Sequence, residues 1–218
     1  MKSEFINKEN NTKLILFFNG WGMDESVVKH IDASGFDICV FSHYDNDFTI
    51  DIELIVSYSE VILIAWSMGV WAAAKTLFTT GVKINKSIAI NGTLSPVDDN
   101  NGIPISIFKG TIDNFSERNK QKFDRRMHAS MSDNQKFKEI ESSRLLEDQL
   151  DELKLIYDLA MEEQVDSKFD KAIVGTSDLI FPTRNQLHFW KERADIRELE
   201  LPHFPFFSFN SWTEIVDL

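Results

Sequence analysis

The segment at residues 61–75 constrains the fold more than any other part of the chain, because it changes from strand to helix chemistry at a serine. Residues 61–65 form an uninterrupted apolar run, which is typical of a parallel strand covered on both faces. Residues 69–80 contain consecutive alanines and favour a helix. Ser67 therefore lies on the turn between a predicted buried strand and a predicted helix.

Small residues flank this serine in the pattern Ala65-x-Ser67-x-Gly69. The pattern differs by one methyl group from the G-x-S-x-G nucleophile elbow, which presents a serine hydroxyl above the carboxyl edge of a sheet. Such an elbow needs small residues because its turn brings the strand and helix backbones close together. The match is weak by itself, but the strand before it and the helix after it strengthen it. We interpret Ser67 as a candidate nucleophile.

Apolar runs alternate with helical patterns along the chain, which predicts an α/β fold with a mostly parallel central sheet flanked by helices, in a single domain of residues 1–218. The predicted strands are residues 14–18, 38–41, 61–65, 87–90, 105–108, 172–174 and 197–201. The predicted helices are residues 25–31, 69–80, 183–193 and 211–216.

The interval between the predicted strands 105–108 and 172–174 is too long for a simple crossover. Within it, residues 137–160 place apolar side chains at spacings of three and four, which predicts one or two amphipathic helices. We interpret residues 111–166 as a helical lid inserted after the strand at 105–108. The alternative is a helical appendage that only covers the sheet.

Charge is unevenly distributed along the chain. The net charge of −12 argues against nucleic acid as a partner. Residues 116–138 nevertheless hold seven basic and three acidic residues, a local charge of +4. This segment is either a docking face for an acidic partner or an ordinary charged helix surface. Its basic residues are Arg118, Lys120, Lys122, Arg125, Arg126, Lys136 and Lys138.

The apolar runs and the single cysteine of the sequence lead us to expect a cytoplasmic protein. No segment approaches the roughly 20 apolar residues of a membrane span, so we expect no membrane association. The N-terminus lacks the apolar run of a signal peptide. Cys39 is the single cysteine and lies in an apolar run, so we expect an inert core residue.

A serine nucleophile needs a histidine to take its proton and an acid to orient that histidine, and in elbow-type folds they follow in the order Ser, acid, His. Asp178 follows a predicted strand and a glycine turn, and His203 lies between prolines after the last predicted strand. Asp113 is the competing acid, and Asp178 matches the usual position better. The other histidines, His30, His43, His128 and His188, are expected to be structural or solvated.

Hydrolysis also needs N–H donors for the negative charge on the attacked carbonyl oxygen. The backbone N–H of Met68, just after Ser67, is the first candidate. The second is the backbone N–H of Trp21, because Gly20 and Gly22 allow a sharp turn after the first predicted strand.

Together these segments resemble the α/β-hydrolase superfamily and, more narrowly, the short BioG type of pimeloyl-[acyl-carrier protein] methyl ester esterases of biotin synthesis. Asn19 replaces the histidine that usually begins the oxyanion loop in the broader esterase group, which leaves the backbone donor unaffected. The resemblance is carried by residues 18–24 (Phe-Asn-Gly-Trp-Gly-Met-Asp), 65–69 (Ala-Trp-Ser-Met-Gly), 90–93 (Ile-Asn-Gly-Thr), 175–178 (Gly-Thr-Ser-Asp) and 202–206 (Pro-His-Phe-Pro-Phe).

The resemblance implies a serine esterase that removes the methyl ester, with Ser67, His203 and Asp178 as its triad and without metal or cofactor. It also implies an acidic acyl carrier protein as partner, which favours the docking interpretation of the basic segment, and a monomer is expected. General carboxylesterase or thioesterase activity and an inactive binding scaffold are the alternatives. Expected docking residues are Arg118, Lys122, Arg125 and Arg126, and expected acyl-channel residues are Trp21, Trp66, Trp71, Phe206 and Phe207.

Overall fold

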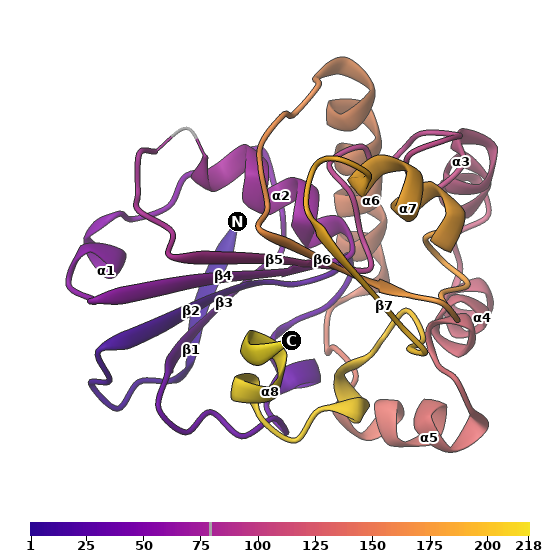
Figure 1. Cartoon of the computed structure of the whole chain (residues 1–218). Coiled ribbons are helices and arrows are strands. Elements are labelled where there is room, and N and C mark those ends of the chain that lie inside the picture. The colour runs from indigo at the N-terminus through magenta and orange to yellow at the C-terminus, as the bar shows by residue number, and fades with distance from the viewer. Residues whose placement is uncertain (79) are drawn as a thin grey trace.

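The computed structural model describes residues 1–78 and 80–218. Its centre is a seven-stranded sheet in the order β1-β3-β2-β4-β5-β6-β7 (Figure 1). All neighbouring strands are parallel except β1, which pairs antiparallel with β3 at one edge. The strands are β1 Lys2–Asn7, β2 Lys13–Phe18, β3 Asp37–Ser42, β4 Glu60–Trp66, β5 Lys86–Ile90, β6 Lys171–Gly175 and β7 Asp195–Leu199.

Helices lie on both faces of this sheet, with α2 on one face and α8 on the other (Figure 1). This arrangement explains the uninterrupted apolar runs of β2 and β4, because parallel strands that are covered twice bury the side chains on both of their faces, here all but the first residue of each strand. The helices are α1 Glu53–Val56, α2 Met68–Leu77, α3 Ile105–Asp113, α4 Glu117–Met127, α5 Met131–Ile140, α6 Leu146–Glu162, α7 Thr183–Trp190 and α8 Trp212–Asp217, with 3-10 turns η1 Glu25–Val28 and η2 Phe206–Ser208.

Four of these helices, α3 to α6, form one insertion between β5 and β6, which we call the helical insertion. Figure 1 shows α3, α4 and α5 gathered beyond the end of the sheet toward which the parallel strands run. The amphipathic pattern predicted at residues 137–160 falls on the end of α5 and most of α6. Of the helices in the described part of the chain, none is both long and apolar enough to cross a bilayer.

The prediction of a strand at residues 105–108 was wrong, because these residues form the first turn of α3. Pro104 sits at the N-cap, and the helix buries Phe108 while it leaves Ile107 53% exposed. A short run of alternating apolar residues after a proline fits a strand as well as a helix start. The insertion therefore follows β5 and not a strand at 105–108.

Smaller differences concern two elements that were not predicted, one helix that is a 3-10 turn, and the ends of two others. The half-exposed strand β1 and the short helix α1 were not predicted, and the predicted helix at 25–31 is the 3-10 turn η1. Strand β7 begins and ends two residues earlier than the predicted 197–201. The predicted helix at 69–80 corresponds to α2, and its prediction included residue 79, which lies outside the described residues.

Candidate active site

Ser67 occupies a strained turn between β4 and α2. Its φ of 58° and ψ of −125° lie in a region that residues with a side chain rarely adopt. The backbone is held there by a hydrogen bond from Ser67 N–H to the carbonyl of Ile90. A Cβ atom on Gly69 would lie 2.2 Å from the carbonyl oxygen of Phe18, so only glycine fits the close approach of helix and strand. The predicted elbow geometry is therefore present at Ser67.

His203 and Asp178 lie next to this serine although they are far away in the sequence. Nδ1 of His203 lies 2.9 Å from Oδ2 of Asp178, and Nε2 of His203 lies 3.0 Å from Oγ of Ser67. An ionised carboxylate can only accept, so Nδ1 carries the ring proton and Nε2 is left to accept the serine hydroxyl proton. All three residues are buried. In this arrangement the histidine ring lies where it could take the proton of the serine hydroxyl.

The carboxylate of Asp178 is fixed on both of its oxygens. Oδ1 accepts hydrogen bonds from the backbone N–H groups of Ile180 and Phe181, and Oδ2 accepts one from Nε2 of Gln186 in α7. The competing candidate Asp113 is an exposed residue of α3 that pairs with Lys109 on the same helix. The structure thus brings Asp178, and not Asp113, to the histidine.

The loop that carries His203 is held by two residues whose roles the sequence did not reveal. Nε1 of Trp66 donates to the carbonyl of His203 at 2.7 Å. The Asn91 side chain donates to the carbonyls of Pro202 and His203 and accepts from the N–H of Gly175. Asn91 has a φ of 47°, which asparagine tolerates better than most residues. A buried polar residue at the carboxyl end of β5 is the signal that would have found it.

The turn at residues 19–22 faces the same space as Ser67. Trp21, Met68 and Ser67 all line one cavity. The N–H of Met68 is the first of helix α2, so it has no acceptor within the helix. The two residues predicted to supply oxyanion donors, Trp21 and Met68, therefore both line the cavity of the candidate nucleophile, one from each predicted turn.

The cavity walls are mainly apolar, and the helical insertion supplies about half of them. Of the predicted channel residues, Trp21 and Trp66 line it, and Trp71, Phe206 and Phe207 do not. Trp71 packs edge-on against Phe48, Phe206 packs against Phe17 beneath Trp66, and Phe207 packs near His30 and His128. The insertion contributes Ile107, Phe108, Thr111, Phe123, Arg126, Met127 and Leu153.

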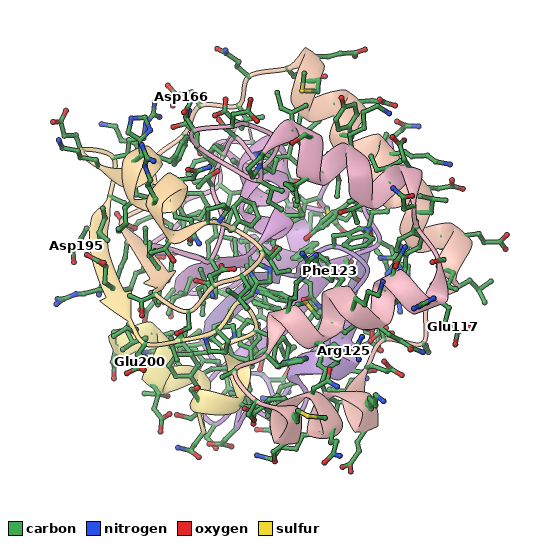
Figure 2. The ribbon with its side chains drawn as sticks, turned by 90° about the vertical axis from the view of Figure 1, so that its right-hand side faces the viewer. Glu117, Phe123, Arg125, Asp166, Asp195 and Glu200 are labelled. Atoms are coloured by element: carbon green, nitrogen blue, oxygen red, sulfur yellow. The ribbon has the colours of Figure 1, made fainter. Side chains whose placement is uncertain are left out.

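The predicted docking residues lie on α4, which crosses the front of the molecule in Figure 2. Arg118, Lys122, Arg125 and Arg126 are all exposed. In the described part of the chain none of these four side chains makes an ion pair, whereas Lys120 pairs with Asp124. Arg126 also lines the cavity. The helix therefore presents unpaired positive charge beside the cavity entrance.

The remaining titratable groups singled out by sequence lie outside this constellation. His128 is buried among Phe137, Phe204 and Phe207, and this burial lowers its pKa to about 4. Burial raises the pKa of the Cys39 thiol to about 12. His30 contacts the carbonyl of Phe206, His43 contacts Ser42 and His188 contacts Asn101.

Comparison with known proteins gives this geometry its context. The family model described as "Pimeloyl-ACP methyl esterase BioG" matches residues 1–215. A malonyl-[acyl-carrier protein] O-methyltransferase of Bacteroides fragilis is 42% identical over 194 residues, which cover 87% of this chain and 39% of that protein. The chain thus spans about two fifths of that relative's length.

Solved structures agree with the family match. The crystal structure of BioG from Haemophilus influenzae superposes with a TM-score of 0.91 and 31% identity, covering 98% of this chain and 99% of that one. An enol-lactonase from Burkholderia xenovorans, 12% identical, has a TM-score of 0.66 over 99% of this chain and 95% of its own, which shows the shared α/β-hydrolase fold alone. The chain has the α/β-hydrolase fold and belongs to the BioG family.

Proposed function

We propose that this protein hydrolyses the methyl ester of pimeloyl-[acyl-carrier protein], with Ser67, His203 and Asp178 as its catalytic triad. The observation that carries the proposal is the hydrogen-bonded chain from Asp178 through His203 to Ser67, located at the wall of an apolar cavity. Membership of the BioG family supports the substrate.

The reaction follows from the geometry. Nε2 of His203 takes the hydroxyl proton while Oγ of Ser67 attacks the ester carbonyl carbon. The oxyanion that forms is stabilised by the backbone N–H groups of Trp21 and Met68. When the carbon–oxygen bond to the methoxy group breaks, His203 returns the proton and methanol leaves. Water activated by His203 then cleaves the acyl-enzyme, which frees the pimeloyl carboxylate and restores Ser67.

The cavity suits an alkyl chain that enters with its ester end first. Its apolar wall continues to the exposed side chains of Ile107 and Leu179 at the mouth. The carrier-linked end of the acyl chain would remain outside, next to the unpaired cations of α4. An acidic carrier protein would be attracted to these cations, although the protein as a whole carries a net charge of −12.

The methyltransferase relative gives independent support for a carrier-bound methyl ester. By its name, that protein transfers a methyl group to malonyl-[acyl-carrier protein], and this chain matches only 39% of its length. The two names together point to a methyl ester of a carrier-bound acid, which is the class of ester that we propose for this chain.

The decisive experiment is hydrolysis of the pimeloyl-carrier methyl ester by wild type and by Ser67→Ala, followed on a gel that separates ester from acid. Cleavage by wild type alone supports both the reaction and the nucleophile. If wild type hydrolyses p-nitrophenyl esters but not the carrier ester, the general carboxylesterase becomes the better assignment. If a fluorophosphonate probe fails to label the folded protein, the inactive binding scaffold becomes the better assignment.

The proposal that an acidic carrier protein docks on α4 has a separate test. We expect Lys122→Glu/Arg125→Glu to slow cleavage of the carrier ester and to leave hydrolysis of a short p-nitrophenyl ester unchanged, because neither side chain lines the cavity. Lys83→Glu is the matched control, since Lys83 is exposed and precedes β5 at the opposite end of the sheet. Equal rates for both variants at every salt concentration would contradict docking on α4.

A further inference from the structure

A buried carboxylate on α6 holds the turn that carries Trp21. Oε2 of Glu152 accepts the backbone N–H of Gly22 at 2.9 Å, and Oε1 accepts the backbone N–H of Tyr44 at 2.7 Å. Arg144 pairs with Oε2 at 2.6 Å, and both charged side chains are at most 4% exposed. A charge buried this deeply destabilises the fold unless it is paired and hydrogen-bonded. The contacts of Glu152 are therefore expected to hold the backbone of Gly22 and Tyr44 in a fixed geometry.

A second contact from α6 fixes the same turn. Nε1 of Trp21 donates to the backbone carbonyl of Gln149 at 2.6 Å. Gly22 has a φ of 72°, and a Cβ atom there would lie 2.9 Å from Oε1 of Gln149. The indole and the following peptide group are therefore both anchored to one helix of the insertion, on either side of the Trp21 backbone.

The loop after β3 completes the support. The hydroxyl of Tyr44 donates to the carbonyl of Asn19 at 2.7 Å, while its N–H is bound by Glu152. The Asn19 side chain in turn accepts the N–H of Gly20 and donates to the carbonyl of Asp24. Glu152 thus joins two loops that together hold the turn from its first residue to its last.

We propose that Glu152, held by Arg144, is a positioning residue that fixes the Trp21–Gly22 turn so that the backbone N–H of Trp21 faces the oxyanion formed at Ser67. The inference rests on the proposed esterase function. It assigns α6 a role beyond covering the cavity, because the helix that closes one wall also sets the position of an oxyanion donor. A displacement of about 1 Å in such a group can reduce the rate a hundredfold.

The test uses a short p-nitrophenyl ester, which does not depend on carrier docking, and the variant Glu152→Gln. The N–H groups of Gly22 and Tyr44 bond to different oxygens of Glu152, and glutamine replaces one of these oxygens by an NH₂ group that cannot accept. We expect kcat to fall by about ten- to a hundredfold with KM little changed, because the lost interaction acts in the transition state. The inhibition constant of a trifluoromethyl ketone, whose hemiketal oxygen occupies the oxyanion site, should rise by a similar factor.

Asp37→Asn is the matched control. Asp37 is also a buried carboxylate that accepts two backbone N–H groups, those of Glu9 and Asn11. It lies at the start of β3, at the end of the sheet opposite to Ser67. We expect this variant to lose thermal stability while its kcat and its inhibition constant stay within twofold of wild type.

The outcomes separate the inference from the function on which it rests. If Ser67→Ala is inactive while Glu152→Gln folds and keeps the wild-type kcat, the positioning role of Glu152 is overturned and the proposed esterase function stands. If Ser67→Ala retains full activity, both the positioning role and the proposed function are overturned. If Glu152→Gln does not fold, Tyr44→Phe decides, because it removes only the hydroxyl through which the loop held by Glu152 supports the carbonyl of Asn19. A lower kcat at constant KM in Tyr44→Phe supports the inference, and wild-type kinetics refute it.

Discussion

Replacing Asn91 by alanine should destabilise the protein and also loosen the loop that carries His203. The Asn91 side chain makes three hydrogen bonds to backbone groups that lie far away in the sequence, namely those of Gly175, Pro202 and His203. Each such bond contributes about 1 kcal/mol net. The φ of 47° adds about 1 kcal/mol against alanine, since a Cβ is disfavoured there and asparagine compensates locally.

The sum is about 4 kcal/mol, which corresponds to a decrease in Tm of about 8–16 °C for a domain of this size. Urea denaturation followed by tryptophan fluorescence measures the free energy of unfolding. Initial rates on a p-nitrophenyl ester, measured under conditions in which the variant is still folded, show whether the loss of Asn91 displaces His203. We expect a fall in kcat, because His203 then keeps only its Trp66 contact to hold its carbonyl.

Asn85→Ala is the control for this prediction. The Asn85 side chain accepts the N–H of Val61 at 2.9 Å, at the opposite end of the sheet. Losing this single bond should cost about 1 kcal/mol and leave kcat unchanged. An Asn91→Ala protein within 1 kcal/mol of wild type, or one with wild-type kcat, would refute the reasoning.

Three further outcomes are expected. Gly69→Ala should destabilise the protein by about 3 kcal/mol in urea titrations, because the added Cβ meets a backbone oxygen at 2.2 Å; a neutral effect would mean that the elbow is less tight. Asp178→Asn should lower kcat about 10⁴-fold, whereas Asp113→Asn should not change it, in the same ester assay. His128 has a folded-state pKa near 4 against 6.5 in the unfolded chain, so the unfolded state binds more protons between these pH values and stability is lost as the pH falls. From pH 7 to pH 5 this group should remove about 2 kcal/mol, and His128→Phe should abolish that part of the pH dependence in urea titrations at the two pH values.

Local patterns were enough to predict the core of the fold and the three residues that meet at the candidate site. The buried strands read as apolar runs because they are covered on both faces, and the tight turn at Ser67 requires small neighbours that the sequence shows directly. Asp178 and His203 each follow a strand, and the carboxyl ends of parallel strands meet at one edge. Their proximity to Ser67 follows from topology without knowledge of any side-chain contact.

The residue type and its position in the sequence were not enough to predict which aromatic side chains line the cavity. Trp66 lines the cavity, while Trp71 is a buried residue of α2 that packs against Phe48. Phe206 and Phe207 follow His203 in the chain but fall on a 3-10 turn that packs away from the cavity. The direction of a side chain in a loop depends on the dihedral angles of one or two residues, which composition and periodicity do not determine.

The polar contacts that fix the site were beyond sequence reasoning for a different physical reason. Glu152 occurs in an amphipathic helix rich in acidic residues, where a glutamate normally belongs to the solvated face. It is buried because Arg144 and two backbone N–H groups, one of them 130 residues away, converge on it. Each partner is an ordinary residue in its own segment, so no single segment carries the signal. Such networks are strongly destabilised when one member is removed. Substitutions on α6 that look conservative by sequence should therefore slow hydrolysis of a short p-nitrophenyl ester more than substitutions on α4, which contacts Trp21 through the ring of Phe123.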